Sequence, residues 1–347
     1  MNPSTMKGFI DMKKIMMVFF AVALLLLFMA NIFYGSVEIP AQGVAAALLG
    51  EECSDVWRLI VVETRLPQAM TALLAGAAIS VSGLVLQTLF NNPLAGPEVL
   101  GINSGAGLGV AVVMLLAQGT LFAGAMGLHG YFAILAGAFA GSLAVISLIL
   151  LLSSVLRNKM YLLIAGVAVS FLISSAISIM NYLATSEGVH SYMIWGMGSF
   201  SGVSLSQLPM FAVPVVLLMA VAVYMTKPLN ALLLGDDYAA NLGVNVMTAR
   251  VVLLAVVGLI IAVVTAFCGP VTFLGLAVPH IARLLMKSSS HNCLLPATML
   301  AGASVALLCN IICQLPGESG LMPLGAVTPL VGAPVIIYVL LSNRGNA

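Results

Sequence analysis

The sequence predicts an all-α integral membrane protein, a single polytopic domain over residues 1–347 that crosses the bilayer ten times. The first reason is composition, because 62% of the residues are hydrophobic and 7% are charged, whereas a soluble domain carries about 25% charged residues. The second is the length of the apolar runs, since a bilayer-spanning helix needs about 20 such residues. The third is the collection of Lys and Arg in alternate connections. With a net charge of +1 and no basic run, we expect no nucleic-acid partner.

The apolar runs place the ten helices along the chain. We expect them at 15–35, 66–90, 99–117, 131–153, 160–183, 206–226, 247–267, 271–286, 293–314 and 325–342. The first run is longer than the roughly 7–15 apolar residues of a signal-peptide core, so we expect it to remain as a helix. Glycines at four-residue spacing predict close contact between helix backbones. They are Gly101, Gly105 and Gly109 in the third helix and Gly137 and Gly141 in the fourth.

The basic residues decide the orientation. With the N-terminus inside, ten of the 12 Lys and Arg residues lie on the inner side, and only Arg58 and Arg65 lie outside. Because cytoplasmic loops carry the excess of positive charge, we expect both termini in the cytoplasm. Glu98 falls in an inner connection, and we expect no charged residue at mid-membrane. A carrier driven by an ion gradient usually keeps such a residue in its bundle, so any transport by this chain is expected to draw its energy from another chain.

A polar stretch, LFNNPLAGPEVLG at 89–101, separates the second helix from the third. Pro93 disfavours helical geometry at Asn92, and asparagine tolerates the left-handed conformation that ends many helices. Pro97 suits the first turn of the helix that follows. The stretch is therefore expected to form a compact, rigid reversal at the inner surface. A tight turn without any further role also accounts for Asn92, Pro93 and Pro97.

The longest inner connection is KPLNALLLGDDYAANLGVNV at 227–246. Its leucines form an apolar face before Gly235, and Asp236 and Asp237 open a second short segment in which Ala239 and Leu242 share one side. This pattern predicts two short amphipathic helices at about 229–245 on the membrane surface. They could form a docking surface for a cytoplasmic partner, or they could simply be solvated surface helices.

These residues carry a resemblance to a known family. The segment RLPQAMTALLAGAAISVSGLVLQTLFNNPLAGPEVLGINSGAGLGV resembles the signature region of the permease subunits of iron-siderophore, haem and cobalamin ABC importers. Further matching blocks follow in the same order and cover nearly the whole chain. They are LLIAGVAVS (162–170), IWGMGSFSGVS (194–204), LGDDYAANLGV (234–244), GPVTFLGLAVPHIARLL (269–285) and PLGAVTPLVGAPVIIYVLL (323–341).

The resemblance implies the type II ABC importer permease fold, with ten transmembrane helices and inverted repeats. Helices two and three and helices seven and eight are faintly alike, which agrees with such repeats. In the family two copies form the pathway between them in the inner membrane. Two ATP-binding subunits dock from the cytoplasm, and an extracytoplasmic substrate-binding protein docks from outside. No cofactor and no resident metal are implied, and the chain itself is not expected to be an enzyme.

The resemblance also implies which residues of this chain occupy the family's functional positions. The ATPase-coupling motif falls on Asp236, Asp237, Ala239, Leu242 and Gly243. The cytoplasmic gate falls near Asn158 and Lys159, although Lys159 could also be a simple membrane anchor. Docking of the binding protein falls on Arg65, and Arg58 could assist. The family's second docking arginine is replaced here by Gln68, and the last outer loop, CQLPGESGLMPLG, has no arginine, so the usual pair of arginine contacts is in doubt.

Two other classes of protein fit the sequence less well. A self-contained secondary transporter of a small hydrophilic solute would need the mid-membrane charge that the sequence does not show. A membrane-embedded enzyme would need clustered His, Asp or Glu within the bilayer, and the four His have no paired spacing. The sequence also lacks the G-x-x-x-x-G-K-[ST] phosphate loop of ATPases. The cargo is left open, because the candidate lining residues Gln87, Ser80 and Asn181 do not discriminate between haem, cobalamin and siderophores.

Overall fold

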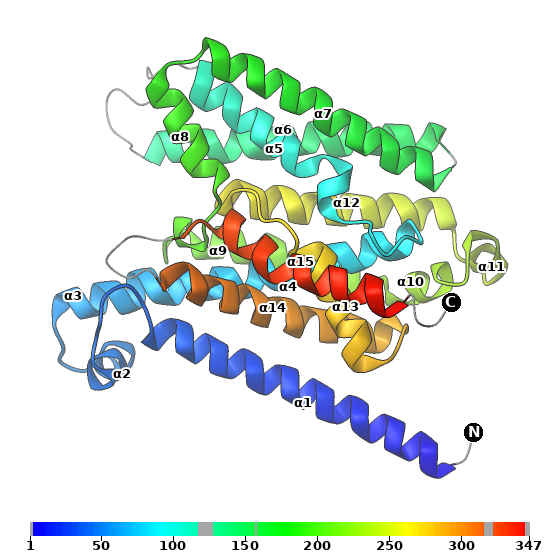
Figure 1. Cartoon of the computed structure of the whole chain (residues 1–347), viewed down its shortest axis with the longest axis horizontal. Coiled ribbons are helices and arrows are strands. Elements are labelled where there is room, and N and C mark those ends of the chain that lie inside the picture. The colour runs from blue at the N-terminus through cyan, green and yellow to red at the C-terminus, as the bar shows by residue number, and fades with distance from the viewer. Residues whose placement is uncertain (1–2, 117–127, 157, 316–321, 344–347) are drawn as a thin grey trace.

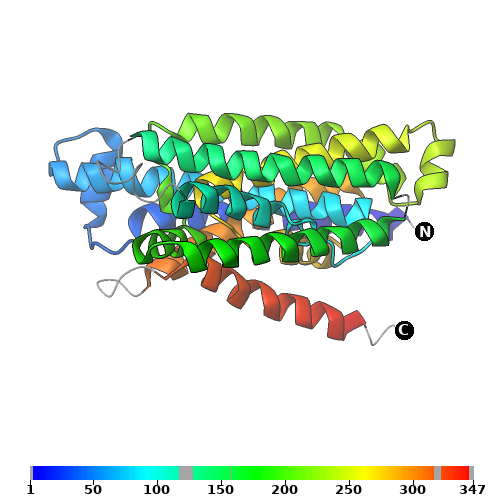
Figure 2. The same ribbon diagram turned by 90° about the horizontal axis from the view of Figure 1, so that it is seen from above.

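The computed structural model describes residues 3–116, 128–156, 158–315 and 322–343, and within them the chain is helical with no strand. The predicted all-α membrane fold is confirmed. The long helices run side by side along the longest axis of the molecule (Figures 1 and 2). They are α1 (Pro3–Phe33), α4 (Leu66–Leu89), α6 (Leu128–Val155), α7 (Lys159–Leu183), α9 (Leu208–Tyr224), α12 (Val246–Cys268), α14 (His291–Gln314) and α15 (Leu324–Asn343).

Shorter elements complete the chain. The α-helices among them are α2 (Ala41–Leu49), α3 (Asp55–Arg58), α5 (Ile102–Ala111), α8 (Ser186–Gly196), α10 (Thr226–Leu232), α11 (Asp236–Asn241) and α13 (Leu274–Met286). The π-helical segments are η1 (Leu59–Arg65) and η3 (Val112–Leu116), and the 3-10 helices are η2 (Pro97–Leu100) and η4 (Phe200–Gly202). Sequence patterns missed α2, α3 and α8, because such short helices contain too few turns to show a periodic apolar face.

The number of spans is compatible with ten. Six helices in the described part of the chain are long and apolar enough to cross a bilayer, and α9 with α10, which meet at a bend of 53°, makes seven if the pair is counted as one span. Three shorter apolar helices accompany them, at Ile102–Leu115, Leu274–Met286 and Leu324–Tyr338. The shorter helices lie beside the long ones in the bundle, as expected where irregular backbone at membrane depth is covered by protein (Figure 1).

The two ends of the bundle differ. Helices α10 and α11 lie at the same end as the N-terminus, and helices α2, α3 and α8 lie at the opposite end (Figure 1). We call the first the inner end and the second the outer end, after the orientation that the basic residues predict. Helix α4 runs from the outer to the inner end and α12 runs back. Each is followed by a break and a short helix, which is the arrangement expected of inverted repeats.

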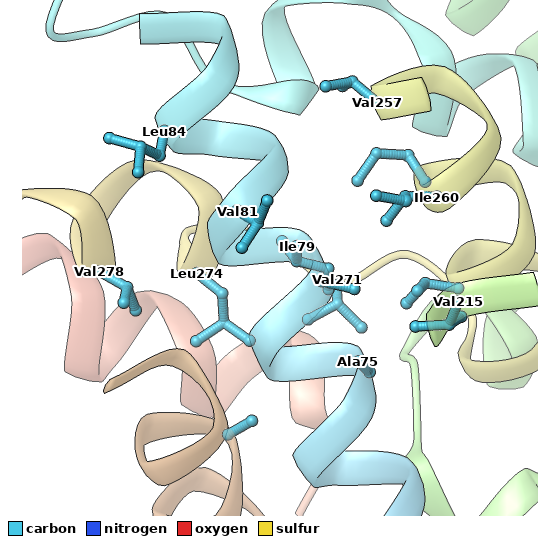
Figure 3. Packing of buried hydrophobic residues seen from close by; sticks show 14 of the residues in the cluster. Ala75, Ile79, Val81, Leu84, Val215, Val257, Ile260, Val271, Leu274 and Val278 are labelled. Atoms are coloured by element: carbon cyan, nitrogen blue, oxygen red, sulfur yellow. The ribbon is translucent and has the colours of Figure 1, made fainter. Parts of the chain in front are cut away.

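Helix α4 lies at the centre and is buried on nearly all sides. Figure 3 shows its side chains among those of α9, α12 and α13. Two of its glycines allow this packing. A Cβ on Gly76 would stand 2.4 Å from the carbonyl oxygen of Gly302 in α14, and one on Gly83 would stand 1.7 Å from that of Gly275 in α13. Backbones this close leave no room for a side chain, so these glycines determine how near the helices come.

The glycines at four-residue spacing lie at a close contact of helix backbones, as expected, and the structure shows that the third and fourth transmembrane helices are the partners. A Cβ on Gly105 would meet the carbonyl oxygen of Gly141 at 2.6 Å, and one on Gly109 would meet that of Gly137 at 1.8 Å. Helices α5 and α6 therefore touch through their backbones along this stripe. Gly101 lies just before α5 and has a different role, because its φ of 74° ends η2 and starts the new helix.

Candidate functional site at the inner end

Helices α10 and α11 form a compact cap on the inner end of the bundle. Leu229 and Leu232 of α10 are buried, as is Ala239 of α11, so one side of this helix pair is packed against the bundle. Asp236 makes an ion pair with Arg250 in the first turns of α12, with 2.8 Å between Nη2 and Oδ2. Ala239 and Asp236, both predicted to serve in coupling, thus make contacts within this chain that fix α11 to it.

The opposite side of α11 exposes large apolar side chains. Leu234, Tyr238 and Leu242 are 63%, 52% and 58% exposed. The four-residue spacing of Tyr238 and Leu242 brings these two to one side of α11. Leu234 lies just before the helix, ahead of the non-helical Gly235, and Asp237 and Gly243 are exposed too. We call these five residues the coupling surface. Tyr238 was not among the predicted coupling residues, although its four-residue spacing to Leu242 was a signal that could have found it, and Leu234 was predicted only as part of the apolar face before Gly235. Apolar groups gathered at a polar end of the molecule are typical of a protein–protein contact.

The polar stretch between α4 and α5 forms a tight reversal, as predicted, and we call residues 90–101 the inner turn. Asn91 ends α4 with a left-handed φ of 46°. Asn92 then closes the reversal, because its side-chain oxygen accepts the Leu94 amide at 2.9 Å and its carbonyl accepts the Ala95 amide at 3.1 Å. The carbonyl of Pro93 lies 2.8 Å from His280 Nε2 of α13. Local hydrogen bonds shape the turn, and α13 holds it in place.

Glu98 lies deeper in the bundle than the sequence pattern predicts. Its Oε1 accepts the backbone N–H of Phe273 at 2.8 Å, which is the residue before α13. Since α13 has 13 residues, each rising about 1.5 Å, its start lies about 20 Å from its inner end. A helix that starts inside the membrane has amide groups without acceptors. The carboxylate of Glu98 supplies one, which explains why the inner turn folds back into the bundle instead of staying at its surface.

The predicted gate residues lie at the start of α7. Asn158 is exposed and caps the helix, because its Oδ1 accepts the Met160 amide at 2.9 Å. Lys159 is the first residue of α7, and its side chain lies outside the described part of the structure. The inner turn packs against this helix. A Cβ on Gly166 of α7 would meet the Val99 carbonyl oxygen at 2.6 Å, and one on Gly101 would meet Ser170 Oγ at 2.8 Å.

Helix α7 leaves much of its own surface uncovered. Ser174, Ser175 and Ser178 are exposed beside large apolar side chains such as Phe171 and Ile179. The hydroxyls of Ser175 and Ser178 donate to the carbonyls four residues earlier, so the face is only weakly polar. By contrast, the candidate lining residues Gln87 and Ser80 are buried between helices of this chain, which contradicts that expectation. Asn181 on α7 is partly exposed.

Arg65 differs from the docking residue that the resemblance implied. Only 4% of it is exposed, and its guanidinium donates to the carbonyls of Ile32, Phe33 and Val37 at the end of α1 and just beyond. It thereby supplies donors to carbonyls that the end of a helix leaves unpaired. Arg58, at the end of α3, is exposed at the outer end. Burial of Arg65 argues against direct contact with a docked protein, and leaves Arg58 as the accessible arginine of the two.

Gln68 also has a partner within the chain. Its Nε2 donates to Asn310 Oδ1 at 3.0 Å, and Asn310 Nδ2 donates to Asn31 Oδ1 at 2.7 Å. The three side chains are buried and join α4, α14 and α1. An arginine at position 68 would bring an unpaired charge into this amide network, so the departure from the family pattern has a structural reason here.

Replacing Arg65 by methionine is expected to destabilise the protein by about 3 kcal/mol, because buried carbonyls lose a charged donor. The matched control, Arg58→Met, removes an exposed arginine and is expected to change stability by less than about 0.5 kcal/mol. Thermal unfolding of the two purified variants in detergent measures the difference. Equal unfolding temperatures would show that Arg65 does not hold the end of α1.

The histidines do not form a metal site in the described part of the chain, where no group of three His, Cys, Asp or Glu side chains converges. His280 and His291 are buried at the inner end and bonded to protein groups. His190 is exposed on α8 at the outer end. The side chain of His129 lies outside the described residues.

Comparison with known proteins agrees with this architecture. The FecCD transport family matches residues 23–342. The vitamin B12 import system permease protein BtuC of Klebsiella pneumoniae is 38% identical over 297 residues, which cover 86% of this chain and 87% of that protein. BtuC of Shigella boydii is 38% identical over 298 residues, covering 85% and 88%. An inward-facing structure of a metal-chelate type ABC transporter superposes with a TM-score of 0.80 at 26% identity, covering 94% of this chain and 98% of that one. The predicted resemblance is confirmed, and the chain belongs to the FecCD transport family.

Proposed function

We propose that this chain is the permease subunit of an ATP-driven importer of a metal chelate. The observation that carries the proposal is the coupling surface, an exposed apolar patch on a helix pair that is packed and ion-paired to the rest of the bundle. Such a patch suits a partner that binds from the inner side and moves α10 and α11 as one body. The sequence has no phosphate loop, so the ATP-binding partner is a separate chain.

The proposed role as a permease subunit also implies the partners of this chain. The chain acts as a homodimer in the inner membrane, with both termini in the cytoplasm and two ATP-binding subunits on the coupling surfaces. The substrate-binding protein docks at the outer end, where Arg58 is the accessible arginine. The pathway runs between the two copies along the exposed face of α7, and Asn158 and Lys159 lie at its inner mouth.

Cobalamin is the cargo that we propose. The vitamin B12 permeases at 38% identity support it, and the structural relative is a metal-chelate transporter. A face such as that of α7, which mixes weakly polar serines with aromatic and aliphatic groups, suits a bulky chelate that must pass without being held. Ferric siderophores and haem are the alternatives within the same class.

The rival function is a secondary transporter of a small hydrophilic solute, and Glu98 is the observation in its favour. A carboxylate inside a bundle can relay a coupling ion. Here, however, the carboxylate already binds the Phe273 amide at the start of α13. The bond gives this carboxylate a role at the start of α13 that needs no ion, which makes a structural cap the better assignment.

The proposal is tested in proteoliposomes that hold the permease with its cognate ATP-binding subunit, supplied with the cognate binding protein outside and ATP inside. We expect uptake of radiolabelled cobalamin that stops when the ATPase carries a disabling phosphate-loop substitution. Ferric siderophore and haem are tested side by side. Uptake of one of those in place of cobalamin would contradict the proposed cargo but support the proposed ATP-driven importer. Uptake that is insensitive to the ATPase substitution would contradict the proposed function.

A further inference from the structure

A second feature of the inner end is a chain of three polar side chains from three helices. His291, the first residue of α14, is 1% exposed. Its backbone N–H donates to Asn230 Oδ1 of α10 at 2.8 Å, and the same oxygen lies 3.1 Å from His291 Nδ1. On the other side of the ring, Nε2 lies 2.9 Å from Thr88 Oγ1 of α4. We call Asn230, His291 and Thr88 the polar relay.

The chemistry of the groups fixes the direction of each bond. A backbone N–H donates only to an acceptor, so the atom of Asn230 that faces His291 is its oxygen. With that oxygen opposite Nδ1, the neutral ring carries its proton on Nδ1 and donates it to Asn230. Nε2 is then an acceptor and receives the hydroxyl proton of Thr88. In this arrangement each contact of the polar relay pairs one donor with one acceptor, and the single hydroxyl proton of Thr88, which could also go to the Leu84 carbonyl, goes to Nε2.

The contact between His291 and Thr88 can be broken without leaving a buried donor unpaired. Thr88 Oγ1 also lies 3.0 Å from the carbonyl of Leu84, one helical turn earlier. If α14 and α4 separate, the hydroxyl can turn to that carbonyl. The Asn230 bond to the backbone N–H of His291 serves a separate purpose. It caps the start of α14 and would be needed even without any Thr88 contact.

The polar relay stands between the coupling surface and the inner turn. At one end, Asn230 belongs to α10, which leads directly into α11. At the other end, Thr88 is the second-last residue of α4, immediately before the inner turn. The inner turn is bonded to α13 through Pro93 and Glu98 and packs on α7 at Gly101. A shift of α10 can thus pass through hydrogen bonds and the chain itself to the inner turn, and from there through close packing at Gly101 to α7, the helix that Asn158 caps.

We propose that the polar relay sets the register between the coupling helices and the inner turn, with His291 and Thr88 as positioning residues for coupling. This inference rests on the proposed function. Apolar packing between α10, α14 and α4 would hold these helices together but would tolerate sliding, because it has no direction. Hydrogen bonds at two opposite ring nitrogens define one register, so movement of α10 displaces the inner turn and α7 instead of being lost between helices.

Thr88→Val tests the polar relay, because it keeps the shape of the side chain, removes the hydroxyl and leaves the Asn230 cap intact. The readout is the number of ATP molecules hydrolysed per cobalamin imported in the reconstituted complex. We expect this ratio to rise about fivefold or more, the lower end of typical coupling between sites. Subunit assembly and basal ATP hydrolysis are expected to stay at wild-type values. Thr88→Ser restores the hydroxyl and is expected to restore the ratio.

Thr298→Val is the matched control. Thr298 is a fully buried threonine of α14 whose hydroxyl has no hydrogen-bond partner among the described residues, so the same change of side chain there is expected to leave the ratio unchanged. A wild-type ratio for Thr88→Val in an intact complex would overturn the polar relay, and so would an equal rise for Thr298→Val. If the wild-type complex itself shows no ATP-dependent import, the proposed function fails and the polar relay fails with it.

Discussion

Replacing Tyr238 and Leu242 together by aspartate is expected to weaken binding of the ATP-binding subunit at least a hundredfold. Each side chain buried in a contact contributes about 1.5–3 kcal/mol, and every 1.4 kcal/mol is about tenfold in affinity. The new carboxylates would also have to be desolvated at the interface. Because both residues are exposed, the permease itself is expected to fold and insert normally. Co-purification from detergent, followed by a titration of the ATPase on the immobilised permease, measures the loss.

The control for this double variant is Leu49→Asp at the outer end. Leu49 is 74% exposed on α2, so the same chemical change is made at the end of the bundle opposite the coupling surface. Its affinity for the ATPase is expected to equal that of the wild type. If the Tyr238 and Leu242 variant binds equally well, the coupling surface lies elsewhere.

Gly83→Ala is expected to cost about 3 kcal/mol or more in stability, at the upper end for overpacked interiors. The added methyl group would stand 1.7 Å from the backbone carbonyl oxygen of Gly275, so no flexible side chain can yield. Helices α4 and α13 must then move apart, which also strains the bonds of the inner turn to α13. A lower yield of folded protein and a lower unfolding temperature in detergent are the measurements.

Gly196→Ala provides the comparison. Gly196 is the last residue of α8, and a Cβ there would meet no atom of the described part of the chain within 4 Å. Alanine is also the better helix former by about 0.8–1.0 kcal/mol. We therefore expect wild-type or slightly higher stability for Gly196→Ala. An unfolding temperature for Gly83→Ala that matches it would show that α4 and α13 are not in backbone contact.

Much of the fold could be predicted because it depends on local patterns. Apolar runs mark the long helices, glycines at four-residue spacing mark the contact of α5 with α6, and Pro93 and Asn91 mark the inner turn. Contacts between segments far apart in the sequence produce no such local pattern. The bond of Glu98 to Phe273 joins residues 175 positions apart in the chain, so a residue assigned to the inner surface proved to cap a helix inside the bundle.

The candidate sites were predicted only in part for the same reason, because their contacts also involve distant segments. Resemblance places a residue in a motif but does not say which side of a helix it occupies. Leu242 and Asp237 face outward, whereas Ala239 faces the bundle, and the exposed Tyr238 between them went unnoticed. Arg65 kept its place in the family motif, yet three carbonyls near the end of α1 surround it. These acceptors are backbone carbonyls, which every residue carries, so a sequence motif cannot identify them.

We propose that this chain provides the transport path and the helices that move, while a second chain provides the energy. The most direct test compares cobalamin uptake by proteoliposomes holding the permease alone with uptake by those holding the permease and its ATPase, both with the binding protein and ATP. We expect uptake above background only in the second set, ending when ATP is replaced by a non-hydrolysable analogue. Accumulation by the permease alone, driven by an ion gradient, would contradict the account.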